Sequence, residues 1–345
     1  MADTTIRKNE LISFKTVASV LALSGLVYLV CQIPVQLFIL YLAFLIALAL
    51  YPCIEWLTRK RIPKGLSIAT VFIVFAAILG FLIFTVGTIL LSQGQQLITH
   101  FPDYLKFATA QIKTLPILGH QKFALESAMQ KFNGQFSQSY GFLVSSLGYV
   151  IGLLTSIFSL FTILIFTYFF LAEGPYFKNI FRDIIPFSCR DCVLTIVNEI
   201  LDGVGAYVRG QLLVVIISGL VVGIALTLLQ VPYAYIQGLL LAFLDMIPVI
   251  GPLVALSIGV IITLGSKMAL VPWVIAIYLG NQQLENAFVF PTIMRHSLKL
   301  HGFWILLSIF ICSSVFGVAG ILMAVPIAIT VRVLFKHFIL KPEPA

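Results

Sequence analysis

Residues 16–54 read TVASVLALSGLVYLVCQIPVQLFILYLAFLIALALYPCI, and no Asp, Glu, Lys or Arg interrupts them. A helix needs roughly 20 apolar residues to cross the hydrocarbon core of a bilayer. This stretch is therefore long enough for two membrane spans, with a break at Ile33-Pro34. A helix in the core of a soluble protein keeps one polar face, and this stretch has none.

The same pattern recurs along the chain, because residues 65–99, 137–172 and 210–244 also lack charged side chains. Of the 345 residues, 60% are hydrophobic and only 10% are charged, whereas soluble domains carry about 25% charged residues. We therefore predict an all-α, polytopic integral membrane protein. It should have about eight transmembrane helices, two of them broken or re-entrant, and additional amphipathic helices outside the membrane.

The basic residues indicate the orientation of the chain in the membrane. The densest cluster is Arg59-Lys60-Arg61-Ile62-Pro63-Lys64, and such clusters stay on the cytoplasmic side. Two predicted spans precede this cluster, so the N-terminus should also be cytoplasmic, and Arg332 and Lys336 near the other end place the C-terminus there too. The first apolar run has no evident cleavage site of a signal peptide. We expect a multi-pass protein of the bacterial inner membrane, with the lipid bilayer as its surroundings.

Changes in polarity divide the chain into five regions. Residues 92–139 are polar but carry apolar residues at helical spacing, which predicts two amphipathic helices on the membrane or on a partner subunit. Parity places this segment on the outer face, although its lysines fit that side poorly. The expected regions are residues 1–91 (transmembrane helices 1–3), 92–139 (amphipathic segment), 140–172 (transmembrane helix 4), 173–209 (cytoplasmic amphipathic helices) and 210–345 (C-terminal transmembrane core).

Two of the apolar runs in the C-terminal core are interrupted. The first contains Asp245, followed by Pro248, Gly251 and Pro252, and the second contains Gly317, Gly320 and Pro326. Broken helices near the middle of the membrane form substrate or ion sites in many transporters.

Asp245 is the only charged residue between Arg209 and Lys267. An acid inside a membrane is costly and indicates function. Asp245 is thus a candidate ion or proton carrier. It could also cap a half-helix, and both roles could hold.

A second polar cluster lies at residues 281–286. Gln282, Glu285 and Asn286 fall on one stripe of an otherwise apolar helix, which suggests a polar cavity or seam between helices. The alternative is a helix end that emerges among lipid headgroups. Arg209 could pair with a buried acid or extend to the interface.

Several kinds of function leave no trace in the sequence. The five cysteines give no disulfide framework, and Cys189-x-x-Cys192 lacks the partners of a zinc site. No Walker A loop or dinucleotide motif occurs, so ATP-driven transport would need a separate subunit. The basic residues behind the net charge of +8 gather at the ends of apolar runs. We therefore expect no cofactor, no metal and no nucleic acid.

Six motifs in order resemble the AI-2E family of transporters, also called PerM-like permeases. They are Tyr207-Val208-Arg209-Gly210-Gln211, Val231-Pro232-Tyr233, residues 245–252, Gln283-Leu284-Glu285-Asn286, residues 316–320 and residues 324–326. Val249 stands where the family usually has an aromatic residue, and Gly302 where it has a proline. The resemblance implies a transporter of the export type and a homo-oligomer, and leaves the cargo open.

Four functions remain open at this level. The first is a secondary exporter of a small solute, similar to the autoinducer-2 signal from which the family takes its name. The second is a Na⁺(Li⁺)/H⁺ antiporter that uses Asp245 and Glu285, because some family members resemble such antiporters. The third is a non-transporting oligomeric scaffold or channel. The last is an intramembrane protease, which would need a second aspartate within a span.

Overall fold

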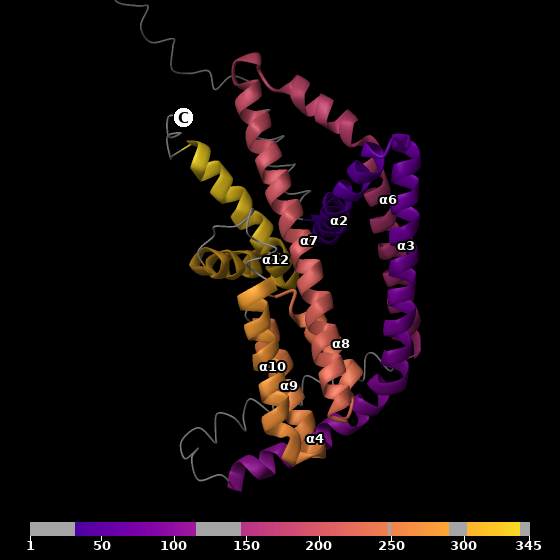
Figure 1. Cartoon of the computed structure of the whole chain (residues 1–345), viewed down its shortest axis with the longest axis vertical. Helices are drawn as coiled ribbons and strands as arrows, with labels where there is room; N and C mark the ends of the chain where they lie inside the picture. Colours follow the sequence, from indigo (N-terminus) through magenta and orange to yellow (C-terminus); the bar gives the residue numbers. More distant parts are fainter. Residues whose placement is uncertain (1–31, 115–145, 248–249, 290–301, 339–345) are drawn as a thin grey trace, which may run out of the picture.

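The computed structural model describes residues 32–114, 146–247, 250–289 and 302–338 (Figure 1). This part of the chain is helical and contains no strand. The α-helices are α2 (Pro34–Arg59), α3 (Lys64–Ile89), α4 (Gln95–Thr114), α6 (Ser146–Ile184), α7 (Arg190–Leu228), α8 (Ala234–Leu244), α9 (Ile250–Ser266), α10 (Val271–Leu284) and α12 (Gly302–Phe338). Short turns of π-helix (Leu90–Gly94 and Glu285–Val289) and 3₁₀-helix (Phe187–Cys189 and Met268–Leu270) complete it.

Five of these helices are long and apolar enough to cross a membrane. They cover Pro34–Arg59, Lys64–Gly94, Thr155–Ile184, Arg190–Leu228 and Ala319–Phe338. Many of their large side chains point outward, for example Phe81, Phe158 and Phe338. An apolar surface of this extent needs lipid around it, and the structure confirms the prediction of an all-α, polytopic membrane protein. The first predicted span and the second predicted amphipathic helix lie outside the described residues.

Helix α7 connects the two packed regions of the molecule. Its N-terminal half packs with α2 and α12 around Val204, Tyr207 and Ile329, and its C-terminal half packs with α8, α9 and α10 around Val222 and Leu226. With 39 residues and a rise of about 1.5 Å per residue, α7 is much longer than the hydrocarbon core of about 30 Å. The boundary expected at residue 209 therefore falls inside one continuous helix, and that expected at 172 falls inside α6.

Small residues bring α7 and α8 together. A Cβ atom added to Gly219 would lie 2.8 Å from Ala242 Cβ, and one added to Gly238 would lie 2.6 Å from Gly219 O. The G-x-x-x-G spacing of Gly219 and Gly223 thus serves close helix packing, as such spacing does in other membrane helices.

Helices α8 and α9 form a hairpin whose two arms pack side by side. Helix α8 has 11 residues, about 16 Å, which is half of the hydrocarbon core. At the open end of the hairpin, Lys267 Nζ donates a hydrogen bond to Gln230 O over 2.8 Å. At the tip, a Cβ on Gly251 would lie 1.7 Å from Leu244 O, so only glycine allows this tight reversal. The first interrupted run is therefore re-entrant in shape.

The second interrupted run bends at Gly317. This residue has φ 59° and ψ −138° inside α12, a conformation that glycine adopts far more readily than other residues. Residues on both sides of the bend, including Ile309, Cys312 and Ala324, pack against each other. A Cβ on Gly320 would lie 1.9 Å from Cys312 O. Pro326 lies in the second arm, and the helix continues past it.

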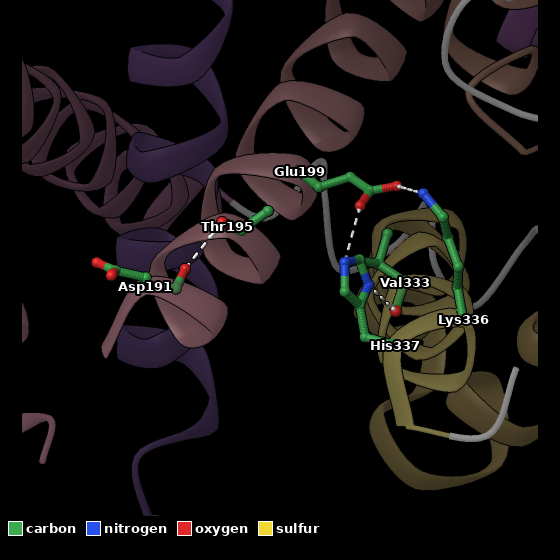
Figure 2. Close-up of polar contacts among 6 residues, drawn as sticks. All are labelled: Asp191, Thr195, Glu199, Val333, Lys336 and His337. Carbon is green, nitrogen blue, oxygen red and sulfur yellow. Dashed lines mark hydrogen bonds and ion pairs between the residues drawn. The ribbon is translucent and has the colours of Figure 1, made fainter. Parts of the chain in front are cut away.

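A polar clasp joins α7 to the end of α12 (Figure 2). Lys336 Nζ lies 2.7 Å from Glu199 Oε1, and His337 Nε2 lies 3.6 Å from Glu199 Oε2. His337 Nδ1 lies 3.0 Å from Val333 O. The clasp is partly exposed, and such pairs contribute about 1 kcal/mol or less each. It therefore fixes the position of the α12 end more than it stabilises the fold.

Candidate ion or proton site

Asp245 lies at the tip of the α8–α9 hairpin, inside the protein. Helix α8 ends at this residue, whose N–H donates to Leu241 O over 2.8 Å. Only 4% of Asp245 is exposed. Its Oδ2 atom has no hydrogen-bond partner among the described residues. A buried polar oxygen without a partner is uncommon and calls for an explanation.

Glu285 is the second buried acid, with 2% exposure. It stands where α10 changes from α-helix to the π-helical turn Glu285–Val289, and such π turns frequently mark functional sites. Asn281 Nδ2 donates to Glu285 Oε1 over 2.6 Å, and Gln282 Nε2 lies 3.4 Å from Oε2. Ser218 Oγ donates to Oε1 as well.

The two acids belong to one polar cluster. Their carboxyl groups are close enough to interact electrostatically, and the Ser218 side chain interacts with both. Gln211 Nε2 donates to the backbone oxygen of Asp245 over 2.9 Å, while its Oε1 is buried without a partner in the described structure. Within the described residues, neither acid forms an ion pair with lysine or arginine. The cluster therefore offers carboxyl and amide oxygen atoms with no lysine or arginine paired to the acids in the described part of the chain.

Arg209 lies apart from the acids and serves the backbone of α2. Pro52, inside α2, has no N–H to donate to Leu48 O, its normal partner four residues earlier. Arg209 Nη1 donates to that oxygen over 3.2 Å. Arg209 thus neither pairs with Asp245 or Glu285 nor simply extends to the interface. It supplies the hydrogen bond that a proline in a membrane helix leaves missing.

The remaining predicted site residues divide between those near the acids and those elsewhere. Gln282 contacts Glu285 and is partly buried, as the stripe predicted, whereas Asn286 is exposed. The polar partner on the same helix is Asn281 instead, four residues before Glu285. Gly251 makes the hairpin tip possible, Pro252 lies in the first turn of α9, and Pro248 lies outside the described residues.

Sequence reasoning did not select Ser218, Gln211 and Asn281 as site residues. A signal was present, because Gln211 and Ser218 are seven residues apart in a very apolar helix and thus share a face. Asn281 precedes Glu285 by four residues, the spacing of side chains that meet on a helix. Only the packing of α7 against α8 and α10 reveals that these faces converge.

A long apolar helix bundle with a re-entrant hairpin and a buried acidic cluster defines a polytopic membrane transporter as the class of this protein. A sequence profile described as AI-2E family transporter matches residues 13–339, and the chain belongs to this family. The chain is 29% identical over 294 residues to "Putative transport protein YueF" of Bacillus subtilis (strain 168), covering 82% of this chain and 79% of that protein.

Two further relatives carry similar names. "Putative transport protein YrrI" of Bacillus subtilis (strain 168) is 24% identical over 304 residues, covering 87% of this chain and 86% of that protein. "AI-2 transport protein TqsA" of Escherichia coli (strain K12) is 25% identical over 326 residues, covering 92% of this chain and 91% of that protein. The family and these names agree on transport, which confirms the transporter prediction at that level.

Proposed function

We propose that this protein is a secondary exporter of a small polar solute in a bacterial inner membrane, with protons bound and released at the Asp245–Glu285 pair. An autoinducer-2-like signal molecule is the first cargo to test, because one relative is named an AI-2 transport protein. Both chain ends are placed in the cytoplasm by the predicted orientation, and the working unit is taken to be a homo-oligomer.

The observation that carries this proposal is the pair of buried acids without a basic partner among the described residues. An uncompensated charge in a membrane interior is costly, and binding of a proton or a cation removes that cost. Asp245 stands at the tip of a hairpin, and the exposed end of a half-helix is where transporters commonly bind their ions. Ser218 interacts with both carboxyl groups, so its hydroxyl group would pass a proton from one carboxyl group to the other.

The test uses the purified full chain in proteoliposomes with an imposed proton gradient. We would measure autoinducer-2 movement and lumenal pH together, for the wild type, Asp245→Asn and Glu285→Gln. Both substitutions keep the size and hydrogen-bonding capacity of the side chain but remove the ability to carry a proton. We expect solute movement driven by the gradient in the wild type and loss of that coupling in both variants.

Asp202→Asn is the matched control, because Asp202 is an exposed acid on α7, away from the cluster. It should transport like the wild type. If Asp245→Asn and Glu285→Gln retain gradient-driven movement, the acids do not carry the coupling proton. If correctly folded protein moves no solute and no proton under any condition, the result would favour the hypothesis of a non-transporting scaffold.

A Na⁺(Li⁺)/H⁺ antiporter is the second candidate, and one observation favours it. Asp245 Oδ2 and Gln211 Oε1 are both buried acceptors without a partner in the described residues, and oxygen atoms at unwound helix ends coordinate Na⁺ in other transporters. The same liposomes distinguish the two functions. Sodium or lithium that collapses the proton gradient without any organic solute, in the wild type but not in Asp245→Asn, would establish antiport.

A further inference from the structure

The corner between α2 and α3 encloses a cavity that the transport site does not use. Its volume is about 430 Å³, and Tyr51, Ile54, Glu55, Thr58, Ile62 and Lys64 line it. In Figure 1 this corner lies where the two indigo helices meet, far from the α8–α9 hairpin. The cavity thus stands at the end of two membrane helices, and both apolar and charged side chains line it.

The corner carries an excess of positive charge. Arg59, Lys60, Arg61 and Lys64 follow closely in the chain, with Glu55 as the one acid beside them. Arg59 Nη2 lies 3.9 Å from Glu55 Oε2, which compensates one of the cations. Lys60, Arg61 and Lys64 have no ion-pair partner in the described part of the chain. Of these three, Lys64 lines the cavity, and the other two stand in the adjoining turn, so this corner would attract an anion.

The turn itself is held in an unusual conformation. Arg61 has φ 67°, which residues other than glycine rarely adopt. Hydrogen bonds from Lys60 N to Leu57 O and from Arg61 N to Thr58 O close the turn. Lys60 Nζ lies 3.7 Å from the centre of the Trp56 ring. These contacts hold the turn, and the basic side chains that it carries, in one conformation.

The surroundings favour a lipid as the source of the anion. Tyr51, Trp56 and Leu66 are large, apolar or aromatic, and more than half exposed, and aromatic side chains of this kind gather at the level of lipid headgroups. A soluble phosphate ester would gain nothing from these side chains, whereas an acyl chain can lie along them. Basic pockets between membrane helices on the cytoplasmic side bind anionic headgroups in other proteins.

From this arrangement we infer that the α2–α3 corner binds an anionic phospholipid of the phosphatidylglycerol type. Lys64, which lines the cavity, would contact the phosphate, and Lys60 in the adjoining turn would add positive charge beside it. Glu55 and Thr58 would accept hydrogen bonds from the glycerol hydroxyls, which accounts for an acid in an otherwise basic site. The acyl chains would follow the outer faces of α2 and α3.

The experiment is native mass spectrometry of the full chain in detergent, titrated separately with phosphatidylglycerol and phosphatidylethanolamine. The wild type should bind phosphatidylglycerol saturably and more tightly than phosphatidylethanolamine. Each basic residue near an anionic lipid contributes about fivefold in affinity, so Lys60→Gln/Lys64→Gln should weaken phosphatidylglycerol binding about 25-fold. Arg61 stays unchanged, because its replacement would test the turn rather than the charge.

The matched control is Lys178→Gln/Arg182→Gln, which removes two exposed positive charges from α6 at the same end of the molecule. It should leave phosphatidylglycerol affinity unchanged. Equal losses in the two double variants, or equal binding of both lipids by the wild type, would overturn the site. Displacement of bound phosphatidylglycerol by millimolar glycerol 3-phosphate would overturn the choice of a lipid and indicate a soluble phosphate ester instead.

Discussion

Single residues in this protein compensate one another over long distances in the sequence. The clearest case is Arg209, which donates to Leu48 O because Pro52 cannot. Inside a membrane, a carbonyl without a donor is costly. The arginine that looked like a partner for a buried acid is therefore explained by a proline 157 positions earlier, as the two residue numbers give.

This pairing predicts a non-additive double mutant. Arg209→Met alone should lower stability by about 2 kcal/mol, because it leaves Leu48 O without its charged donor. In a Pro52→Ala background the new N–H of residue 52 can reach that oxygen, so Arg209→Met should cost about 1 kcal/mol less. Thermal unfolding of the four proteins in one detergent measures the coupling. Additive losses would mean that Arg209 acts elsewhere.

The residue scale also marks the limit of what the sequence could predict about the site. Asp245 and Glu285 stood out, because charged residues are rare in apolar runs. Ser218 and Gln211 did not, since a lone serine or glutamine in a membrane helix has many unremarkable explanations. Asn286, next to Glu285 in the chain, was selected instead of Asn281, although the i, i+4 spacing of Asn281 already indicated contact with Glu285; the structure places Asn281 against Glu285 and leaves Asn286 exposed.

At the scale of elements, the breaks in the helices were predictable and their three-dimensional shape was not. Proline and glycine in residues 245–252 announce an interruption in any apolar run. Whether the chain then continues across the membrane or turns back depends on contacts between distant residues, such as Lys267 with Gln230. At the tip of the hairpin, the chain can turn back because Gly251, which has no side chain, lies against Leu244 O.

Gly251 gives a direct test of the hairpin. A methyl group there would overlap Leu244 O, so Gly251→Ala should force the two arms apart and lower stability by about 3 kcal/mol. Gly280→Ala is the matched control. Its Cβ would meet nothing within 4 Å, and alanine raises helix stability by about 0.5–1 kcal/mol relative to glycine. Thermal denaturation in detergent should therefore separate the two variants in sign; equal effects would contradict the hairpin geometry.

For the whole molecule, the decisive property is that α7 spans both packed regions. Its N-terminal half belongs to the cluster with α2 and α12, and its C-terminal half belongs to the cluster with the hairpin. Gln211 and Ser218 lie between these halves and contact the acids. Under the proposed function, a change of protonation at Asp245 or Glu285 would act directly on α7, which both packed regions share.

A half-helix end at Asp245 requires the α8–α9 hairpin to enter and leave the membrane on the same side. Labelling of introduced cysteines can test this topology. In a variant with all five cysteines replaced, we would introduce Gln230→Cys, Lys267→Cys or Lys60→Cys and treat sealed vesicles of known orientation with an impermeant thiol reagent. A re-entrant hairpin places residues 230 and 267 on the same side, opposite to residue 60. A membrane-crossing run would place residues 230 and 267 on opposite sides. In that case Asp245 would lie within a continuous span, and the half-helix end invoked for ion binding would not exist.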